Sequence, residues 1–331
     1  MQSVTKNQLA EAAVQALCKK SFPQVGAVLV RELKGGMFNA AYLVEGEGLP
    51  GGRAVLKVGP APGTKILTYE QDILQAEVEV YRMLESSGVP TPKVYAADLS
   101  GQEIPAPYFF MEHLPGAPWP DCSKKIPKAD RPALMRALGR YNACIHAIKG
   151  ERFGYLKQNE RFHFSSWGAA FTGMMTDILN DGRAGGCRLP YKAIEAVLQK
   201  HRPLLDEVTQ PCLVDYDMWA GNVFVQPQNG HYEITGIVDF ERAFSGDPYA
   251  DFTSAVMLFK RVEQEPDFIA GYEEISGRPL SITPQDQIRM DLYRLYMSVI
   301  MYVETYRYGN PTAAIMKAIY TPNMRKILKR L

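Results

Sequence analysis

Two aspartates and an asparagine interrupt apolar segments in the second half of the sequence. Asp217 and Asn222 lie five positions apart in LVDYDMWAGNVFV, and Asp239 follows 22 positions after Asp217 in GIVDFE. Because an unpaired buried charge is costly, such groups are expected to be paired, to bind a metal or to line a cleft. Two acidic oxygens and an amide oxygen suit Mg²⁺, and the remaining carboxylate can orient a hydroxyl and accept its proton. The alternative is that all three only form turns.

A lysine inside an apolar strand pattern is the second candidate. Lys57 lies in AVLKV, and the helical segment that follows offers Glu77 as a partner, with Glu70 and Glu79 as competing partners. A strand lysine that is held by a helix glutamate and directed at nucleotide phosphates is an arrangement that kinases use. The alternative is a lysine whose stem packs at a strand edge while its ammonium group reaches water.

A pair of glycines could bring backbone N–H groups close to phosphates. Gly35 and Gly36 lie in ELKGGMFNAAYLV between two β-prone segments, and Asn39 is near enough in sequence to assist. A turn of this kind can bind an anion through its backbone. A glycine pair is also typical of an ordinary hairpin turn, so this motif is weak on its own.

The elements that must position these residues change in type along the chain. Short β-prone segments separated by glycine turns run from residue 25 to about residue 110, and apolar spacing predicts one helix within TYEQDILQAEVEVYRMLESSG. After LPGAPWPD, residues 130–150, 191–208, 251–263 and 291–309 show helical spacing, with Asp130 and Asp251 as expected N-caps. NVFV and ITGIV flank QPQNGHY as in a β-hairpin, which would bring Asp217 and Asn222 close to Asp239.

Composition excludes several classes of function. The chain has 331 residues, of which 37 are basic and 36 acidic, so its net charge of +1 gives no electrostatic reason to expect nucleic acid or an anionic membrane as a partner. Five scattered cysteines without a C-x-x-C pair argue against a disulfide framework and against a zinc site. The absence of long apolar stretches argues against a signal peptide and a membrane span. We therefore expect a cytoplasmic protein, either a monomer or a homodimer.

Taken in order, these motifs resemble those of the aminoglycoside phosphotransferase and choline kinase family. The resemblance runs from about residue 25 to residue 307 and is most specific in DYDMWAGNVFV and GIVDFERAFSGDPYADF. It implies an α+β, bilobal, protein-kinase-like fold. A small β-rich lobe with one helix, residues 1–112, would bind the nucleotide phosphates. A larger, mainly helical lobe, residues 113–331, would carry the catalytic hairpin and the acceptor-binding region.

The resemblance also implies roles for individual residues. Asp217 would be the catalytic base, Asn222 and Asp239 the Mg²⁺ ligands, and Lys57 the phosphate-binding lysine paired with Glu77. The remaining nucleotide contacts would come from the glycine turn and from backbone groups of the hinge, namely Gly35, Gly36, Glu112, His113 and Leu114. The nucleotide would be ATP or GTP, and the acceptor a hydroxylated small molecule.

Residues around this site complete the expectation. Asp247 and Asp251 in GDPYADF would be structural, capping the next helix and bracing the catalytic segment, with Asp251 as the helix N-cap. Helices in the C-terminal region would build the acceptor pocket, although an aromatic stripe of this kind is more often core. The candidates for acceptor contacts there are Tyr293, Tyr296, Tyr302 and Glu304.

One position departs from the family pattern. Asp215 stands where the family has a histidine, two residues before the catalytic aspartate. An aspartate can replace that histidine as a hydrogen-bond acceptor but, when ionised, not as a donor. The additional carboxylate could raise the pKa of a neighbouring group or bind another cation.

Several functions remain open at this point. The first is an O-phosphotransferase, and the second, motivated by Asp215, is a nucleotide-binding pseudokinase with a regulatory role. A protein kinase is disfavoured because the step from Asp239 to Gly246 leaves no room for a long activation segment, and no A-P-E motif is present. A glycosyltransferase with DYD as its metal motif would leave Lys57, Asn222 and Asp239 unexplained.

Overall fold

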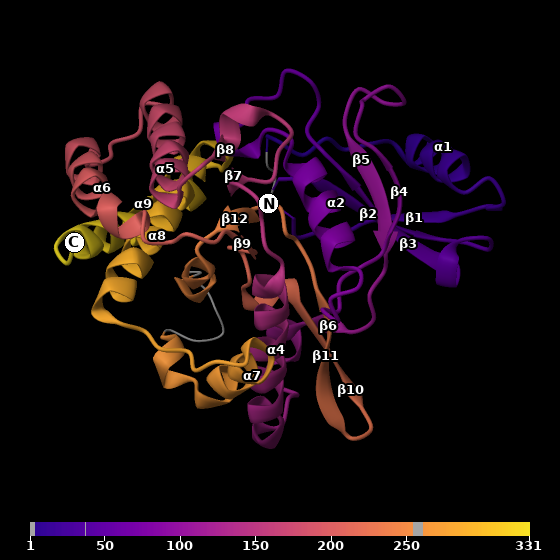
Figure 1. Ribbon diagram of the computed structural model, residues 1–331. Helices are drawn as coiled ribbons and strands as arrows, with labels where there is room; N and C mark the ends of the chain where they lie inside the picture. The colour runs from indigo at the N-terminus through magenta and orange to yellow at the C-terminus, as the bar shows by residue number, and fades with distance from the viewer. Residues whose placement is uncertain (1–3, 37, 254–260) are drawn as a thin grey trace. The chain divides into compact units, whose positions relative to one another are not determined.

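The computed structural model describes residues 4–36, 38–253 and 261–331, and these form two compact units (Figure 1). The first unit consists of residues up to 66 together with 92–114 and 307–309. The second consists of residues 67–91, 115–306 and 310–331. The helix that was expected to belong to the N-terminal lobe falls in the second unit, and a lobe boundary at residue 112 stays a prediction.

A five-stranded antiparallel sheet forms the centre of the first unit. Its strands are β1 (Leu29–Glu32), β2 (Ala40–Glu45), β3 (Arg53–Val58), β4 (Val94–Asp98) and β5 (Tyr108–Glu112). Their order in the sheet is β1-β2-β3-β5-β4. The glycine turns and apolar alternation predicted the first three strands and β5, and the register places Lys57 opposite Ala41 and Phe109.

Helix α1 (Glu11–Ser21) supplies part of the core of this unit (Figure 1). Its buried residues Val14, Leu17 and Cys18 pack with apolar residues of the sheet, because only one face of the helix is apolar. Phe22, directly after the helix, makes an edge-to-face contact with Phe110 of β5. The sheet therefore has one face covered by apolar packing, which fixes the register of its strands.

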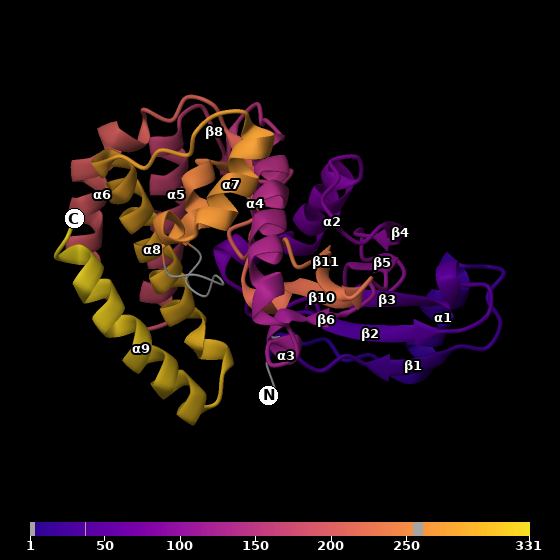
Figure 2. The same cartoon turned by 90° about the horizontal axis from the view of Figure 1, so that it is seen from below.

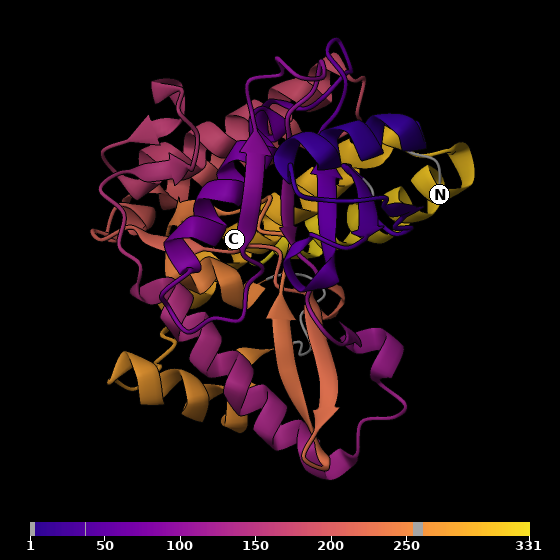
Figure 3. The ribbon, with the colours of Figure 1, turned by 90° about the vertical axis from the view of Figure 1, so that its right-hand side faces the viewer.

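The long hairpin of the second unit is formed by β10 (Val223–Gln228) and β11 (His231–Ile237) (Figure 3). Asn229 and Gly230 link the strands with φ values of 51° and 86°, the left-handed conformation that a two-residue hairpin turn requires. The prediction of this hairpin is confirmed, with a shorter loop than expected. The short strand β6 (Ala117–Pro118) pairs with β10, and Gly116 before it makes this possible, since a Cβ atom there would lie 2.7 Å from the carbonyl oxygen of Val225.

A second small sheet contains the strand that leads into the segment of Asp215 and Asp217. It consists of β7 (Phe153–Tyr155), β8 (His163–Phe164), β9 (Cys212–Val214) and β12 (Phe244–Gly246), in the order β8-β7-β12-β9. Phe244 pairs with Val214 and also with Tyr155. The chain thus returns after Asp239 to pair directly with the strand that precedes Asp215, which holds the two acidic segments together.

Helices are the main secondary structure of the second unit. They are α2 (Ile73–Leu84), α3 (Trp119–Cys122), α4 (Arg131–Ala147), α5 (Trp167–Ala184), α6 (Tyr191–Leu205), α7 (Pro266–Ser276), α8 (Pro284–Val303) and α9 (Asn310–Leu328). Helices α4 and α7 pack side by side, and α9 runs along α8 (Figure 2). Helix α8 begins with a capping box, in which Thr283 and Asp286 exchange side-chain to backbone hydrogen bonds.

The structure corrects the expected role of one helix cap. Asp130 precedes α4 but makes no side-chain capping bond; its carboxylate instead accepts the backbone N–H of Tyr232 at 2.8 Å, which attaches β11 to the start of the helix. The helix expected over residues 251–263 falls largely on residues 254–260, which lie outside the described residues. Helices α3, α5, α7 and α9 were not predicted. No helix within the described ranges has both the length and the apolar character that crossing a membrane requires.

Candidate active site

The segment Asp215–Asp217 follows β9 in a strained backbone conformation. Tyr216 has a φ of 60°, which is uncommon for a residue with a bulky side chain. Its ring is fully buried and stacks on Tyr296, and its hydroxyl donates to the carbonyl oxygen of Tyr293 at 2.6 Å. This anchored turn leaves the side chain of Asp217 22% exposed, so its carboxylate can be reached by a small molecule.

Asp251 stabilises the turn at Tyr216 through hydrogen bonds and has no exposed surface. Its carboxylate accepts the backbone N–H groups of Asp215 at 3.2 Å and Tyr216 at 2.6 Å. The same carboxylate accepts from the amide of Asn142 at 3.1 Å and lies 2.9 Å from Nε2 of His146. Asp251 lies inside a 3₁₀ turn, Pro248–Thr253. It therefore braces the segment Asp215–Asp217, and a helix that it could cap would lie outside the described residues.

Asn222 and Asp239 are brought together at the open end of the hairpin. Val223 pairs with Ile237, and the N–H of Val238 donates to the carbonyl oxygen of Asn222 at 3.0 Å. The side-chain NH₂ of Asn222 donates to the carbonyl oxygen of Asp217 at 3.0 Å. This bond occupies the nitrogen end of the amide and leaves the oxygen as the end that can coordinate a cation.

The side chains of Asn222 and Asp239 fit Mg²⁺ as ligands, but two residues alone do not complete its coordination shell. Asn222 and Asp239 offer oxygen atoms alone, and Mg²⁺ is commonly held by one or two carboxylates together with water and phosphate. Among residues 4–36, 38–253 and 261–331, no group of three or more histidine, cysteine, aspartate or glutamate side chains is placed to hold a metal ion. A metal here would therefore depend on ligands from its substrate.

Tyr81 connects helix α2 to the segment of Asp239. Its hydroxyl donates to Oε1 of Glu77 at 2.9 Å and accepts the backbone N–H of Asp239 at 3.0 Å. Its ring makes an edge-to-face contact with Phe240. Asp239 has a φ of 70°, so this hydrogen bond holds a backbone conformation that is otherwise disfavoured for aspartate.

The expected nucleotide-binding residues of the first unit lie in three places. Lys57 is buried in the central strand β3, and Gly35 and Gly36 are exposed in the turn between β1 and β2. Glu112 ends β5, and His113 and Leu114 follow it, all three partly buried. Glu77, the expected partner of Lys57, belongs to the second unit, and that pairing stays a prediction.

The competing partners of Lys57 have hydrogen bonds of their own. The carboxylate of Glu70 is buried and accepts the backbone N–H of Leu67 at 2.8 Å. Glu79 accepts from the side chain of Gln75 at 3.1 Å, one turn earlier on α2. Glu70 also accepts from the hydroxyl of Tyr306 at 3.5 Å, so each glutamate has hydrogen bonds within the second unit.

Asp215 is the residue that departs from the family pattern, and it is fully buried. Its Oδ1 accepts the backbone N–H of Asp217 at 3.3 Å, which agrees with the expected acceptor role. Its Oδ2 is buried without a hydrogen-bond partner among the described residues. Burial, together with the nearby carboxylates of Asp251 and Asp217, raises the pKa of Asp215 well above its ordinary value.

Arg242 is a site residue that sequence reasoning missed. Its Nε lies 3.3 Å from Oδ2 of Asp217, and its Nη2 lies 2.9 Å from Oε1 of Glu304. The only sequence signal was its place three residues after Asp239, next to Glu241. Glu304, expected to contact the acceptor, is instead buried and paired with Arg242.

The aromatic candidates of α8 are part of the core. Tyr293 is fully buried and donates to Asp247 at 2.7 Å, and Trp167 donates to the hydroxyl of Tyr293 at 2.7 Å. Tyr296 is also buried and shares a hydrogen bond with Tyr155. Tyr302 is 7% exposed. Tyr296 stacks on Tyr216 and so supports the segment before Asp217, and all three rings show little surface to an acceptor.

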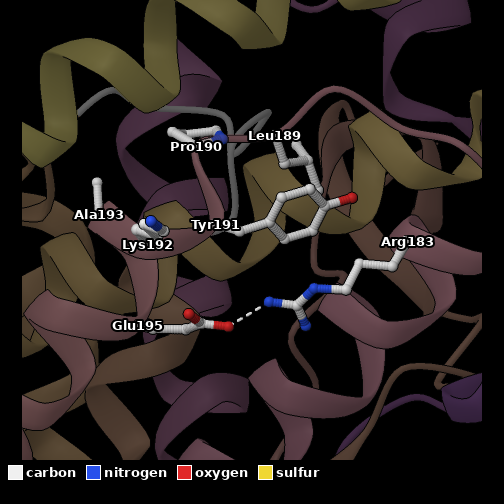
Figure 4. A pocket seen from close by; sticks show the side chains of 7 residues that line it. All are labelled: Arg183, Leu189, Pro190, Tyr191, Lys192, Ala193 and Glu195. Carbon is white, nitrogen blue, oxygen red and sulfur yellow. Dashed lines mark hydrogen bonds and ion pairs between the residues drawn. The ribbon is translucent and has the colours of Figure 1, made fainter.

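A shallow surface pocket of about 540 Å³ lies where α5 ends and α6 begins (Figure 4). Arg183 forms an ion pair with Glu195 across it and lies over the ring of Tyr191. None of its lining residues is among the predicted site residues. The pocket is therefore no part of the candidate site described above.

Comparison with known proteins identifies the family of this chain. Residues 29–284 match the model of the phosphotransferase enzyme family. The chain therefore belongs to the phosphotransferase enzyme family, whose members include kinases of small molecules. The segment from β1 to the start of α8, which includes Asp217, Asn222 and Asp239, lies inside the match.

Solved structures with the same fold span nearly the whole chain. A candidate fructosamine-3-kinase from Thermobifida fusca is 19% identical, with a TM-score of 0.65, covering 97% of this chain and 100% of that protein. Aminoglycoside phosphotransferase APH(4)-Ia in complex with ADP and hygromycin B is 16% identical, with a TM-score of 0.62, covering 96% and 98%. A microcompartment-associated aminopropanol kinase is 16% identical, with a TM-score of 0.57, covering 95% and 96%. The fold is thus α+β and protein-kinase-like, as predicted.

One curated protein also matches. Acyl-CoA dehydrogenase family member 10 of Mus musculus is 22% identical over 237 residues, which are 68% of this chain. The matched segment is 20% of the mouse protein, so this chain corresponds to about a fifth of that relative's length.

Proposed function

We propose that this chain is an ATP- or GTP-dependent O-phosphotransferase that transfers the γ-phosphoryl group to a hydroxyl of a small molecule, with Asp217 as the catalytic base. The observation that carries the proposal is the arrangement at the open end of the hairpin. The carbonyl oxygen of Asn222 accepts the N–H of Val238, next to Asp239, and its side chain donates to the carbonyl oxygen of Asp217. These bonds connect the segments that carry the three proposed site residues. Family membership and fold support the same reading.

Asp217 would orient the hydroxyl of the acceptor and accept its proton as the oxygen attacks phosphorus. Asn222 and Asp239 would hold Mg²⁺, which supplies neutralisation of the charge on the phosphate oxygens. Lys57 would contact the phosphates, with Glu77 as its partner, and the turn at Gly35 and Gly36 would cover them. Backbone groups at Glu112, His113 and Leu114 would meet the base. The chemistry then consists of positioning and electrostatic stabilisation.

The acceptor is proposed only as a class. Similar structures are named for kinases of aminoglycosides, fructosamine and aminopropanol, and several were solved with ADP, ATP or GDP. Those acceptors are hydroxylated molecules that carry amines. The acceptor of this chain could be of the aminoglycoside, macrolide, choline or sugar type.

A coupled assay of nucleotide consumption tests the proposal. ATP and GTP would be offered with Mg²⁺ and a panel of aminoglycosides, macrolides, choline, amino alcohols and sugars. We expect one acceptor class to stimulate turnover, and Asp217→Asn to reduce it by several orders of magnitude, roughly 10³-fold or more, because the base is lost. Asp121→Asn, an exposed aspartate on α3, is the matched control and should retain full turnover.

The same assay decides between catalysis and the pseudokinase alternative, which the buried Asp215 motivates. A protein that binds nucleotide but consumes none with any acceptor would favour a regulatory role. Turnover in Asp217→Asn equal to that of the natural sequence would remove Asp217 from the mechanism.

A further inference from the structure

We propose that Arg242 is a positioning residue for Asp217, and that Tyr69 and Glu304 hold Arg242 in place. This inference rests on the proposed function, because it assigns to Arg242 the task of fixing the carboxylate that meets the acceptor. All four residues belong to the second unit, so the contacts described below lie within one compact body.

Arg242 lies between two carboxylates of different exposure. Its Nε is 3.3 Å from Oδ2 of Asp217, whose side chain is 22% exposed, and its Nη2 is 2.9 Å from Oε1 of Glu304, whose side chain is 2% exposed. The ion pair with Glu304 therefore anchors the guanidinium group on the buried side. Asp217 is the partner on the open side.

The contact with Asp217 is electrostatic in this state. The Nε–H of Arg242 is buried and makes no hydrogen bond to a described residue, although the carboxylate of Asp217 is within ion-pair distance. Catalytic hydrogen bonds are often long or poorly aligned before substrate binds and tighten in the complex. This donor is thus placed to complete a hydrogen bond to Asp217 when the acceptor fixes the rotamer of the carboxylate.

Glu304 is held by Tyr69 as well as by Arg242. The hydroxyl of Tyr69 donates a short hydrogen bond to Oε1 of Glu304, and the guanidinium carbon of Arg242 lies 5.8 Å from the centre of the Tyr69 ring. Burial opposes the charge of Arg242, but the carboxylate of Glu304, with Tyr69 and Asp217, outweighs it and raises the pKa of the guanidinium group. Arg242 therefore stays charged beside the base.

Tyr69 is itself fixed by two contacts on its own segment. The ammonium of Lys157 donates to the carbonyl oxygen of Tyr69 at 2.7 Å. Asp181 of α5 accepts from the backbone N–H of Thr68 at 2.7 Å and from its hydroxyl at 2.9 Å. The segment before α2 is thus attached to α5 and to the loop after β7. A continuous series of contacts leads from this segment through Glu304 to Arg242 and Asp217.

The geometry favours arginine over lysine at position 242. A guanidinium group has separate donors on one rigid plane and can contact two carboxylates at once, whereas an ammonium group is a point charge on a flexible stem. A lysine would retain the charge without spanning both partners. This difference separates positioning from simple charge compensation.

The test compares Arg242→Lys, Arg242→Gln, Tyr69→Phe and the double variant Arg242→Gln with Tyr69→Phe. Turnover would be measured with Mg²⁺, ATP and the acceptor that gives the highest rate in the panel. We expect kcat to fall about 100-fold for Arg242→Gln, about tenfold for Arg242→Lys and severalfold for Tyr69→Phe, since small misplacements of a reacting group have effects of this size. The KM for ATP should stay within twofold of the natural value.

Non-additivity is the decisive readout. If Tyr69 acts through Glu304 and Arg242, the double variant should lose no more activity than Arg242→Gln alone. Tyr191→Phe is the matched control, because it removes another tyrosine hydroxyl from the same unit, one that donates to the carbonyl oxygen of Cys187 rather than to Glu304. That variant should lose stability and keep its kcat.

The outcomes separate this inference from the proposed function. If the natural chain turns over and Asp217→Asn does not, while Tyr69→Phe and Arg242→Lys keep kcat within twofold, the positioning role is wrong and the function stands. Additive losses in the double variant would overturn it as well. If Arg242→Gln fails to fold, Tyr69→Phe and Arg242→Lys still decide. If no acceptor stimulates turnover, the proposed function fails first and the positioning role fails with it.

Discussion

The carboxylate of Asp251 accepts the backbone N–H of Tyr216 at 2.6 Å, and Tyr216 has a φ of 60°. The bond stabilises the strained residue that directly precedes Asp217. We expect Asp251→Asn to lower the free energy of unfolding by roughly 3 kcal/mol, because one oxygen acceptor of a buried network is replaced by a donor. Urea denaturation followed by circular dichroism measures this. A loss of less than about 0.5 kcal/mol, the size expected for the exposed Asp121→Asn, would show that Asp251 does not hold the turn.

Asp215→Asn should change how stability depends on pH. Burial raises the pKa of Asp215, so the folded protein keeps a proton that the unfolded chain releases above about pH 4. The stability of the natural chain therefore decreases as pH rises from that point, until Asp215 ionises in the folded state as well. The amide retains the acceptor for the N–H of Asp217 and exchanges no proton.

We accordingly expect the stability of Asp215→Asn relative to the natural chain to increase from pH 5 to pH 8, by at most about 1.4 kcal/mol per pH unit. Thermal denaturation at several pH values measures the difference. A difference that stays constant over this range would mean that Asp215 is ionised in the folded protein throughout. At each pH, the natural chain measured under the same conditions is the reference for the variant.

Lys157→Met should have the opposite pH signature. Burial lowers the pKa of Lys157 to about 7, below the ordinary value of the unfolded chain. Between about pH 7 and pH 10 the unfolded state binds more protons than the folded state, so the stability of the natural chain rises with pH. Met removes this pH dependence. The free energy of unfolding of the variant, relative to that of the natural chain, should therefore decrease as pH increases from 7 to 10. Chemical denaturation at fixed temperature tests this, and parallel pH curves would contradict it.

Tyr81→Phe should weaken the response to magnesium. The variant loses the hydroxyl that donates to Glu77 and accepts the N–H of Asp239, and keeps the ring that packs on Phe240. Loss of such supporting contacts typically costs a metal site about tenfold or more in affinity. The Mg²⁺ concentration for half-maximal turnover should therefore rise by about that factor, at unchanged KM for the acceptor. An unchanged magnesium curve would separate Tyr81 from the metal-binding segment.

Local patterns predicted those parts of the fold whose causes are local. The Asn229-Gly230 turn has the residues that a tight hairpin requires, so β10 and β11 could be expected, and with them the approach of Asn222 to Asp239. Helix α4 followed from apolar spacing. Helix α5 did not, because Gly168, Gly173 and Gly182, which disfavour a helix, interrupt a sequence whose buried residues otherwise recur at helical spacing.

The candidate site was predictable only for residues that lie within one short motif or are joined by one hairpin. Asp217 and Asn222 are held together by a turn that their spacing already indicates. Arg242, Glu304 and Tyr69 meet through tertiary packing between distant segments, and no periodicity relates them. Glu304 in particular is an acid among aromatic residues, as a pocket residue could be. Its burial depends on its ion pair with Arg242, which a single sequence does not reveal.

The two compact units are each assembled from non-contiguous stretches, and the chain passes from one to the other at residues 66, 91, 114, 306 and 309. No single continuous segment of the chain therefore contains all of either unit, so neither unit can be exchanged or expressed as one segment. Recombination between relatives would have to preserve every crossing point at once. Substrate range in such a chain is expected to diversify through substitutions in place, since swapping whole modules would cut both cores.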